Sequence, residues 1–489
     1  AAARRTLAAT RSAIADARRQ QRALATGAPL PFAFATHFAD AALAGGFDVV
    51  VGNPPWVRPH RTDTATRDTL RTHYAALSRT ATRTAFGAQP DVAAAFTLRA
   101  LDLLRPDGIL ALALPAKLWR SLAGGALRAR LLADATPLAL ADFGDDPTGF
   151  AAAVYPSTLV ARRLTHEPTM PAPITATTTL DALARDAAGT LHTFPVPLAR
   201  LGHATDAHAP WRLVPAAVRD AADTLADAGT RWLDSPLPPP TLGLKTGLNA
   251  AFLVASRDLD ADLRPFTRPA LRGDGVTPWT TPSNGQHLVL PLDDDTAPLA
   301  SLPAPLARHL APHERALRAR ADLKPRDRWW TLFRTELVAR GGWRVCWADI
   351  SRALRATLLP PQSATVPLNS CYGVRCTDAI DALALVALLN APLTSAFLAL
   401  IAEPARGGFH RFLGFTTTSL PLPDWDRARH TLAPLAARAR RGDVPDARTL
   451  HHATLTAYGL RHDTVAPLLA WAIDPRRAPH DLTHSAHAS

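Results

Sequence analysis

Apolar runs of strand length alternate with segments of helix length through the first third of the chain. Phe47–Val51 is rich in β-branched residues, and such a run bounded by turn residues is typical of a buried strand. Further strands are predicted at 109–114 and 138–143, helices at 91–104 and 117–132, and a closing segment at 150–162. Strands that alternate with helices in this way predict a doubly wound α/β sheet.

The segments around this unit have other patterns. Residues 1–30 carry six arginines among alanines, which predicts a basic helix, and 57–87 is a polar stretch that predicts a surface loop with a helix. Residues 163–240 are rich in proline and alanine and end in three consecutive prolines, so we expect a linker region with some helix. A second module with β-like runs and glycine turns is predicted at 241–425, and a helical tail with a disordered end at 426–489.

Composition adds two constraints on partners and environment. The formal net charge of +12 favours a polyanionic partner such as nucleic acid, although a coding bias towards alanine and arginine explains it equally well, since the 489 residues include only three lysines. The three cysteines fit a reducing cytoplasm, and their spacing predicts neither a disulfide framework nor a zinc site. No apolar stretch has the length of a membrane span, and no signal peptide is visible.

The turn that follows the first strand carries the most specific chemistry. Gly52-Asn53-Pro54-Pro55-Trp56 must leave the strand in a tight, extended turn, because two prolines fix the backbone and remove two N–H donors. The side-chain oxygen of Asn53 and the carbonyl of Pro54 can both accept hydrogen bonds from an exocyclic amino group. Trp56 can stack on the ring that carries that group. A strand end with a core tryptophan is the alternative interpretation.

This turn resembles the motif Asn/Asp-Pro-Pro-Tyr/Phe/Trp of the amino-methyltransferases that use S-adenosylmethionine. The resemblance implies that Asn53, Pro54, Pro55 and Trp56 are catalytic, that Asp48 and Asn53 contact the cofactor, and that Trp56 and Phe150 stack on the target base, with Tyr155 in reserve for Phe150. A core phenylalanine is nearly as good an interpretation of Phe150.

In that family a glycine-rich turn and an acidic residue upstream of the motif strand bind the cofactor. The 46 residues before Phe47 contain no such turn. We therefore expect residues 1–162 to be the second half of a Rossmann-like methyltransferase sheet. The chain is then the C-terminal portion of a longer protein, or one piece of a split enzyme.

The second module resembles the target-recognition domain of type IIG-like restriction–modification adenine methyltransferases. Pieces such as Leu242–Val254, Arg344–Ile350 and Gly407–Phe412 match in order. The resemblance implies an α+β domain at 241–425 that reads double-stranded DNA, followed by the helical tail. Plausible DNA-facing residues, each with a solvated surface position as the alternative, are Lys245, Arg272, Arg328, Arg344 and Arg411.

Taken together, these features predict a sequence-specific DNA methyltransferase. It would move a methyl group from S-adenosylmethionine to the N6 amino group of an adenine rotated out of the duplex, in a restriction–modification or phage-defence system. The alternatives are a non-catalytic DNA-specificity fragment and an amino-methyltransferase acting on cytosine N4, RNA or protein glutamine. An upstream or separate cofactor-binding or nuclease part is a further expected partner. These residues contain no nuclease carboxylate cluster.

Overall fold

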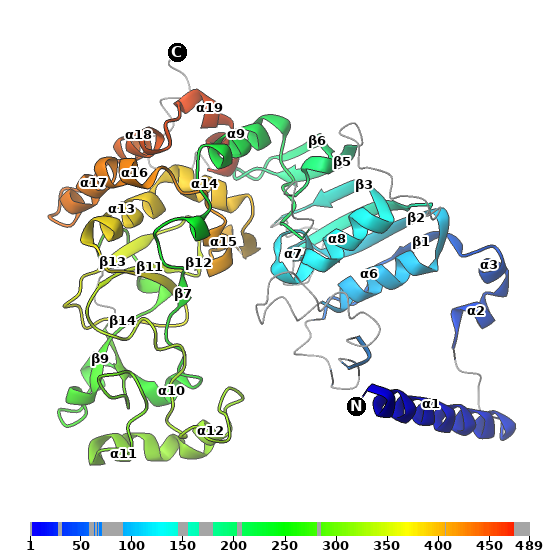
Figure 1. The fold of residues 1–489 in the computed structure, drawn as a ribbon, viewed down its shortest axis with the longest axis horizontal. Helices are drawn as coiled ribbons and strands as arrows, with labels where there is room; N and C mark the ends of the chain where they lie inside the picture. Colours follow the sequence, from blue (N-terminus) through cyan, green and yellow to red (C-terminus); the bar gives the residue numbers. More distant parts are fainter. Residues whose placement is uncertain are drawn as a thin grey trace.

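The computed structural model describes residues 2–27, 32–57, 63, 66, 68–70, 91–144, 155–165, 179–202, 208–280, 285–405 and 407–473. These residues form two units, which we call the N-terminal unit and the C-terminal unit (Figure 1). The N-terminal unit is built on a six-stranded sheet, and the C-terminal unit begins at α9 (Ala216–Asp227). The predicted basic helix is present as α1 (Ala2–Ala25), which extends from the N-terminal unit.

The strands of the N-terminal sheet lie in the order β1-β2-β4-β3-β5-β6. They are β1 (Phe47–Gly52), β2 (Leu104–Pro115), β3 (Ala135–Asp142), β4 (Pro156–Arg163), β5 (Thr179–Arg185) and β6 (Leu191–Pro197). Strands β1, β2, β3 and β5 run in one direction, whereas β4 and β6 run in the other. The predicted strands at 47–51 and 109–114 are thus confirmed as parallel neighbours.

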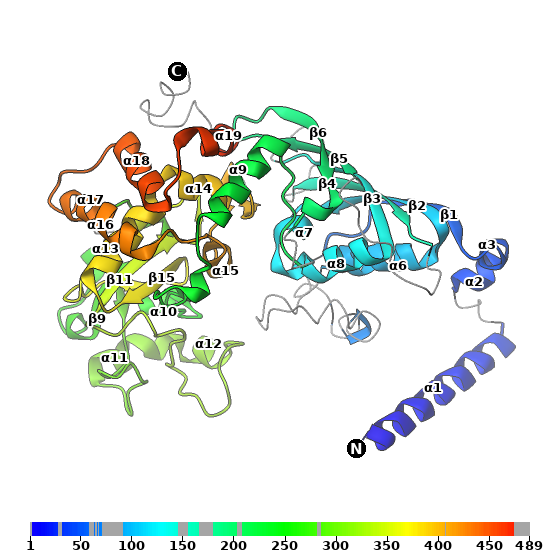
Figure 2. The ribbon, with the colours of Figure 1, turned by 45° about the horizontal axis from the view of Figure 1, so that its top comes forward.

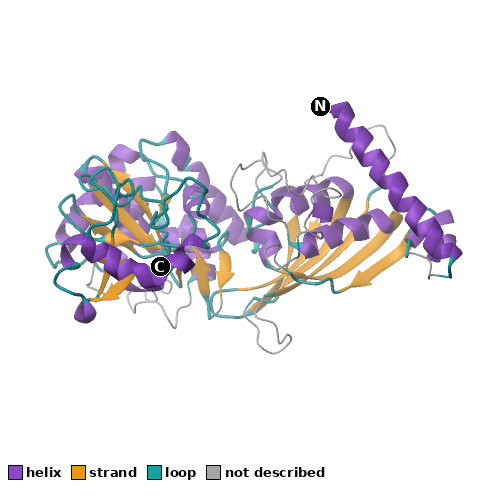
Figure 3. Cartoon of the chain, turned by 90° about the horizontal axis from the view of Figure 1, so that it is seen from below, coloured by secondary structure: helices purple, strands orange, loops and turns teal. Residues whose placement is uncertain are grey.

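Helices cover one face of this sheet among the described residues, which corrects the prediction of a doubly wound arrangement. They are α6 (Val92–Leu103), α7 (Lys117–Arg120) and α8 (Gly125–Asp134), and Figure 3 shows helices on one side of the strands only. The side chains that alternate towards these helices are fully buried, as with Leu110, Leu159 and Ala182. Their neighbours towards the other face are half-buried or exposed. The described sheet is therefore a two-layer α/β structure.

The linker predicted for residues 163–240 is corrected by this topology. Within it, β5 pairs in parallel with β3 and antiparallel with β6, so residues 179–197 complete the sheet. Helix α9 is amphipathic and packs into the core of the C-terminal unit. The expectation of some helix in this region is confirmed, but the described residues are packed elements and not a spacer.

The C-terminal unit combines three small sheets with a set of helices. Its sheets have the orders β13-β11-β15-β7, β14-β9-β10-β8 and β12-β17-β16. Their strands are β7 (Thr241–Leu242), β8 (Leu253–Ala255), β9 (Thr267–Leu271), β10 (Gln286–Val289), β11 (Trp343–Ala348), β12 (Ile350–Ser351), β13 (Ala356–Leu359), β14 (Val366–Pro367), β15 (Cys371–Cys376), β16 (Glu403–Ala405) and β17 (Phe409–Arg411).

The helices of this unit include two that are almost wholly apolar, α13 (Ala379–Asn390) and α14 (Pro392–Ala399). The others are α10 (Asn249–Phe252), α11 (Ala304–Leu310), α12 (Glu314–Arg318), α15 (Gly414–Thr418), α16 (Trp425–Thr431), α17 (Ala433–Ala439), α18 (Ala447–Tyr458) and α19 (His462–Ala472). In the described ranges no single helix is long and apolar enough to cross a membrane. The bent pair α13 and α14 meets that test of length and composition only when the two are taken together.

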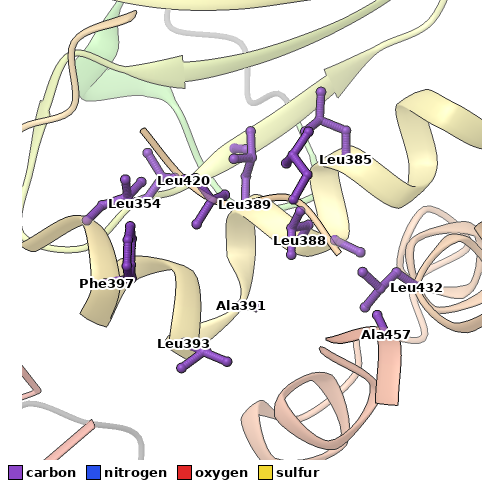
Figure 4. Close-up of a cluster of buried hydrophobic side chains, with 14 of the residues drawn as sticks. Leu354, Leu385, Leu388, Leu389, Ala391, Leu393, Phe397, Leu420, Leu432 and Ala457 are labelled. Carbon is purple, nitrogen blue, oxygen red and sulfur yellow. The ribbon is translucent and has the colours of Figure 1, made fainter. Parts of the chain in front are cut away.

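The main core of the C-terminal unit surrounds α13 and α14. Leu385, Leu388 and Leu389 belong to one buried cluster with Leu432 and Ala457, and Figure 4 shows Leu388 on the side of Leu432. Because Leu432 and Ala457 lie beyond residue 425, the described part of the predicted tail shares one core with the predicted recognition module. The tail predicted at 426–489 is thus helical as far as residue 473 and packs into the core of this unit, and its expected disordered end lies outside the described residues.

The two units touch through α19, which Figure 2 shows beside α9 and near β6. The Trp471 ring lies 5.1 Å from the ring of His192 and 5.9 Å from the ring of Phe194, and it packs against the cores of both units. Its backbone carbonyl accepts a hydrogen bond from the N–H of Ala187 (2.8 Å). One side chain at the end of α19 thus joins the sheet to the C-terminal unit.

Candidate active site

The Asn53 turn lies at the carboxyl edge of the parallel strands. Strand β1 pairs with β2 up to Gly52 opposite Leu112, and the chain then leaves the sheet. Asn53 and Pro55 are exposed, whereas Pro54 between them is buried. In α/β sheets, ligands bind in the crevice outside this edge. The turn therefore presents the Asn53 side chain at the expected position.

Trp56 and Val57 fasten the turn to the neighbouring elements. The indole N–H of Trp56 (Nε1) donates to the carbonyl oxygen of Ala113 on β2 (3.3 Å). The ring packs against the sheet core but remains half-buried, so part of it stays accessible. The N–H of Val92, at the start of α6, donates to the carbonyl of Val57 (3.3 Å). Trp56 is thus anchored in the core and still reaches the surface, and its stacking on a target base stays a prediction.

Two ion pairs at the same edge were not identified from the sequence. Lys117 Nζ lies 2.5 Å from Asp91 Oδ2, and Arg120 Nη2 lies 2.8 Å from Asp142 Oδ2, with both carboxylates almost completely buried. Asp91 also caps α6 by accepting the N–H of Ala93 (3.0 Å). The only feature of the sequence that could have indicated these pairs is the position of their residues. Lys117 and Arg120 follow the end of one parallel strand, and Asp142 ends another. These pairs hold α6, α7 and β3 together at this edge of the sheet.

The C-terminal unit reaches this edge through His410. Burial, together with the nearby Arg120 guanidinium, lowers the pKa of His410 from 6.5 to about 4. The histidine is therefore neutral at physiological pH. A neutral ring lets β17 approach the cationic Arg120 without repulsion, which brings the two units into contact beside the site.

Of the two candidates for the second stacking residue, Tyr155 lies within the described residues. Phe150 lies outside the described residues. Tyr155 is half-buried, and its carbonyl accepts the N–H of Ala116 (2.9 Å). Because β4 runs antiparallel to β2 with Pro156 opposite Pro115, Tyr155 lies at the same sheet edge as the Asn53 turn.

Asp48 lies apart from this edge. It occupies the amino-terminal end of β1, where its Oδ1 accepts a hydrogen bond from Nε of Arg105 (2.7 Å), and both side chains are exposed. Asn53 lies five positions farther along the chain, which is about 16 Å at a rise of about 3.3 Å per residue of extended strand. The structure thus does not bring the two nominated cofactor contacts together.

The five nominated DNA-facing residues have different environments, and one of them is corrected. Arg344 is fully buried on β11, where it donates to the carbonyls of Leu337 (3.0 Å), Ser363 (2.7 Å) and Thr365 (2.8 Å). Its partners show that it supports the fold of this unit and does not face a ligand. A local sequence pattern carries no sign of such burial.

The other four nominated residues reach the surface. Arg272 lies near Asp274 (Nε to Oδ1, 3.4 Å), and Arg411 lies near Glu403 (Nε to Oε2, 4.0 Å). Both approach the end of β11, since Gly273 lies close to Ala348 and Arg411 pairs with Ile350. Lys245 pairs with Asp322 (2.6 Å) and Arg328 packs over Trp330, in another part of the unit. In the described ranges, three or more His, Cys, Asp or Glu side chains nowhere gather as a metal site would require.

Comparisons with known proteins agree with the sequence resemblance. Residues 11–150 match the family model of the Eco57I restriction-modification methylase. The chain is 26% identical over 447 residues to the Type II methyltransferase M.PaeR7I of Pseudomonas aeruginosa, covering 86% of this chain and 72% of that protein. The predicted resemblance to restriction–modification methyltransferases is therefore confirmed.

A solved structure shares the fold. It is that of the Type IIL restriction-modification enzyme MmeI in complex with DNA, with a TM-score of 0.58 at 12% identity. The alignment covers 86% of this chain and 56% of the MmeI chain. The chain thus spans just over half the length of that enzyme. The likeness extends through both units of this chain.

Proposed function

We propose that this chain binds DNA and presents an adenine for methylation at its exocyclic N6 amino group, with S-adenosylmethionine as the methyl donor, within a restriction–modification or phage-defence system. The observation that carries the proposal is the Asn53-Pro54-Pro55-Trp56 turn at the carboxyl edge of β1, with Asn53 exposed and Trp56 anchored to β2. The similarity to M.PaeR7I supports the reaction class.

The residues of the turn would act on the acceptor nitrogen. Asn53 Oδ1 and the carbonyl oxygen of Pro54 accept hydrogen bonds from the amino group, which draws its lone pair out of conjugation with the ring. The buried Pro54 and rigid Pro55 fix both acceptors before the base arrives, so little is lost in ordering them. The half-buried Trp56 ring offers a stacking surface that recovers part of the unstacking cost, which is on the order of a few kcal/mol.

The described residues that fit this reaction are those that would contact the methyl acceptor. When bound, S-adenosylmethionine supplies a methyl group activated by its sulfonium. Asn53 is the one nominated cofactor contact at the carboxyl edge, because Asp48 is ion-paired at the other end of β1. The remaining cofactor contacts are therefore expected from an upstream or separate part of the enzyme. No strongly shifted general base is required, since the proton can leave the nitrogen after transfer.

Recognition of DNA is assigned in this proposal to the C-terminal unit. Arg272 and Arg411 reach the surface at one end of β11, and the chain carries a net charge of +12, which suits phosphate contacts. The MmeI structure was determined with DNA, and this chain shares its fold. His410 lies beside Arg120 and so links this region to the site.

The test is a methyl-transfer assay with tritiated S-adenosylmethionine and mixed-sequence double-stranded DNA, followed by identification of the labelled base. The chain is tested together with the upstream or separate part that is expected to supply the remaining cofactor contacts. The wild type is compared with Asn53→Ala and with Asn369→Ala, which removes another exposed asparagine amide. We expect N6-methyladenine, a loss of label of about 100-fold or more in Asn53→Ala, and no change in Asn369→Ala.

Other outcomes separate the alternatives. Label on cytosine would mean that the acceptor base is cytosine and not adenine, and it would leave the proposed role of the turn unchanged. Salt-sensitive DNA binding without label would support the alternative of a non-catalytic DNA-specificity fragment. Equal label in the wild type and Asn53→Ala would refute the role of the turn.

A further inference from the structure

The short helix α7 is held in place by its surroundings. It begins two positions after β2 ends at Pro115, and it contains only the four residues Lys117–Arg120. A helix of one turn is unstable by itself, so its position is decided by the elements that it touches. Figures 1 and 2 show α7 at the end of the N-terminal unit that faces the C-terminal unit.

Both basic side chains of α7 pair with carboxylates that belong to other elements. Lys117 Nζ lies 2.5 Å from Asp91 Oδ2 at the start of α6, and Arg120 Nη2 lies 2.8 Å from Asp142 Oδ2 at the end of β3. Each of these carboxylate side chains is only 3% exposed. Because a buried charge is strongly unfavourable without its partner, each pair fixes one element against another.

The Lys117 pair is connected to the end of the Asn53 turn. Asp91 caps α6, and the next residue, Val92, donates its N–H to the carbonyl oxygen of Val57 (3.3 Å). Val57 directly follows the turn in the chain. A displacement of Lys117 would therefore pass through an ion pair and a backbone hydrogen bond to the segment that holds Asn53.

The other contacts of α7 lead to the candidates for the second stacking residue. The N–H of Ala116, the residue before α7, donates to the carbonyl oxygen of Tyr155 (2.9 Å). Asp142, the partner of α7 on β3, also accepts the N–H of Gly144 through Oδ1 (3.1 Å). Phe150 follows Gly144 farther along the chain. The helix is thus bonded both towards the acceptor turn and towards the stacking candidates.

The C-terminal unit and the segment that leads to it both contact α7. Strand β16 lies against α7, and His410 on β17 lies beside Arg120. The ring of Trp119 stacks on that of Trp211, with centroids 5.3 Å apart and planes inclined by 8°, and its carbonyl oxygen accepts the backbone N–H of Trp211 (2.8 Å). Trp211 lies five positions before α9. The C-terminal unit therefore contributes to the position of α7.

We propose that Lys117 and Arg120 are positioning residues for the acceptor site. Through their buried partners they place the Asn53 turn and the second stacking residue relative to one another, in an arrangement that the C-terminal unit supports. Neither side chain needs to touch the base for this role. A displacement of about 1 Å in a reacting group can lower a rate on the order of 100-fold. The role rests on the proposed function, because it takes the Asn53 turn as the contact to the amino group.

The test removes the Lys117 pair without leaving a buried charge. Lys117→Met combined with Asp91→Asn replaces both charged groups, and asparagine retains the ability to cap α6. The matched control is Arg130→Met with Asp134→Asn, an ion pair within α8 whose side chains are 45% and 26% exposed. Lys117→Arg is the conservative variant that keeps the charge beside Asp91. All are assayed together with the part that is expected to supply the remaining cofactor contacts.

Four measurements distinguish positioning from stabilisation. They are the methyl-transfer rate at saturating DNA and S-adenosylmethionine, the dissociation constant for DNA, the urea midpoint, and hydrogen exchange at the Val92 amide. Exchange reports the hydrogen bond to Val57 without any need for activity. Arg120→Met with Asp142→Asn is the second variant, and for it exchange is followed at the Gly144 amide.

We expect each double variant of α7 to lower the saturated rate at least about 10-fold and to speed exchange at its reporting amide at least about 10-fold, with the DNA dissociation constant and the urea midpoint unchanged. Lys117→Arg should keep most of the wild-type rate, and the α8 control should equal the wild type.

A wild-type rate in both double variants would overturn the inference, even if exchange is faster. So would a loss of rate that is equal in the α8 control, or one that accompanies an equal loss of DNA affinity. Faster exchange at the reporting amides, with no label on DNA in any sample including the wild type, would count against the proposed function and would support the connection between α7 and the turn.

Discussion

Replacement of Arg344 by methionine should destabilise the C-terminal unit without altering its interaction with DNA. The side chain is fully buried and donates three hydrogen bonds of 2.7 to 3.0 Å to the carbonyls of Leu337, Ser363 and Thr365. Methionine has a similar length but donates none, so the three carbonyls lose a partner. At about 1 kcal/mol each, the loss in unfolding free energy is about 3 kcal/mol. Burial lowers the pKa of Arg344, so relief from burying a charge offsets part of this.

The assay is urea unfolding followed by tryptophan fluorescence, because Trp343 and Trp347 lie on the same strand as Arg344. DNA binding is titrated with salt in parallel. Arg411→Met is the control, since this side chain is about a third exposed, and it should change stability little while reducing the salt slope by about one. If Arg344→Met instead unfolds at the wild-type urea concentration and reduces the salt slope by about one, the structural assignment of Arg344 is wrong.

Two further predictions concern the contact between the units. Trp471→Ala removes the ring that packs on His192 and Phe194. The two units should then unfold in separate transitions, and the radius of gyration measured by small-angle scattering should increase. An unchanged radius of gyration and a single unfolding transition would contradict this. The pKa of His410 is lowered from 6.5 to about 4 in the folded protein, so the unfolded state takes up the proton at a higher pH than the folded state does. The free energy of unfolding should therefore fall as the pH drops from about 6.5 towards about 4, by about 3 kcal/mol over the whole range. Urea midpoints at about pH 7 and about pH 5 should differ in the wild type and differ much less in His410→Gln; equal differences would exclude His410 as the cause.

The elements that the sequence predicted correctly are those with local signals. Asp91 caps the helix expected at 91–104, which is observed as α6, and the strand expected at 109–114 lies within β2. Helix caps, the periodic spacing of apolar residues and helix-breaking residues each involve only a few neighbouring positions. They can therefore be recognised in the sequence without knowledge of distant contacts. The end of β1 at Gly52 belongs to the same class, because the two prolines that follow it lack the N–H donors that would continue the strand.

The features that the sequence did not predict depend on distant partners. Strand β6 contains Pro195 and Pro197, which suggested a spacer, but an edge strand tolerates proline because one side of its backbone needs no partner. Its neighbour β5 joins the sheet only by pairing with β3, about 40 residues earlier. The environment of a charged group also depends on distant partners, because only the surrounding carbonyls distinguish the buried Arg344 from the partly exposed Arg411.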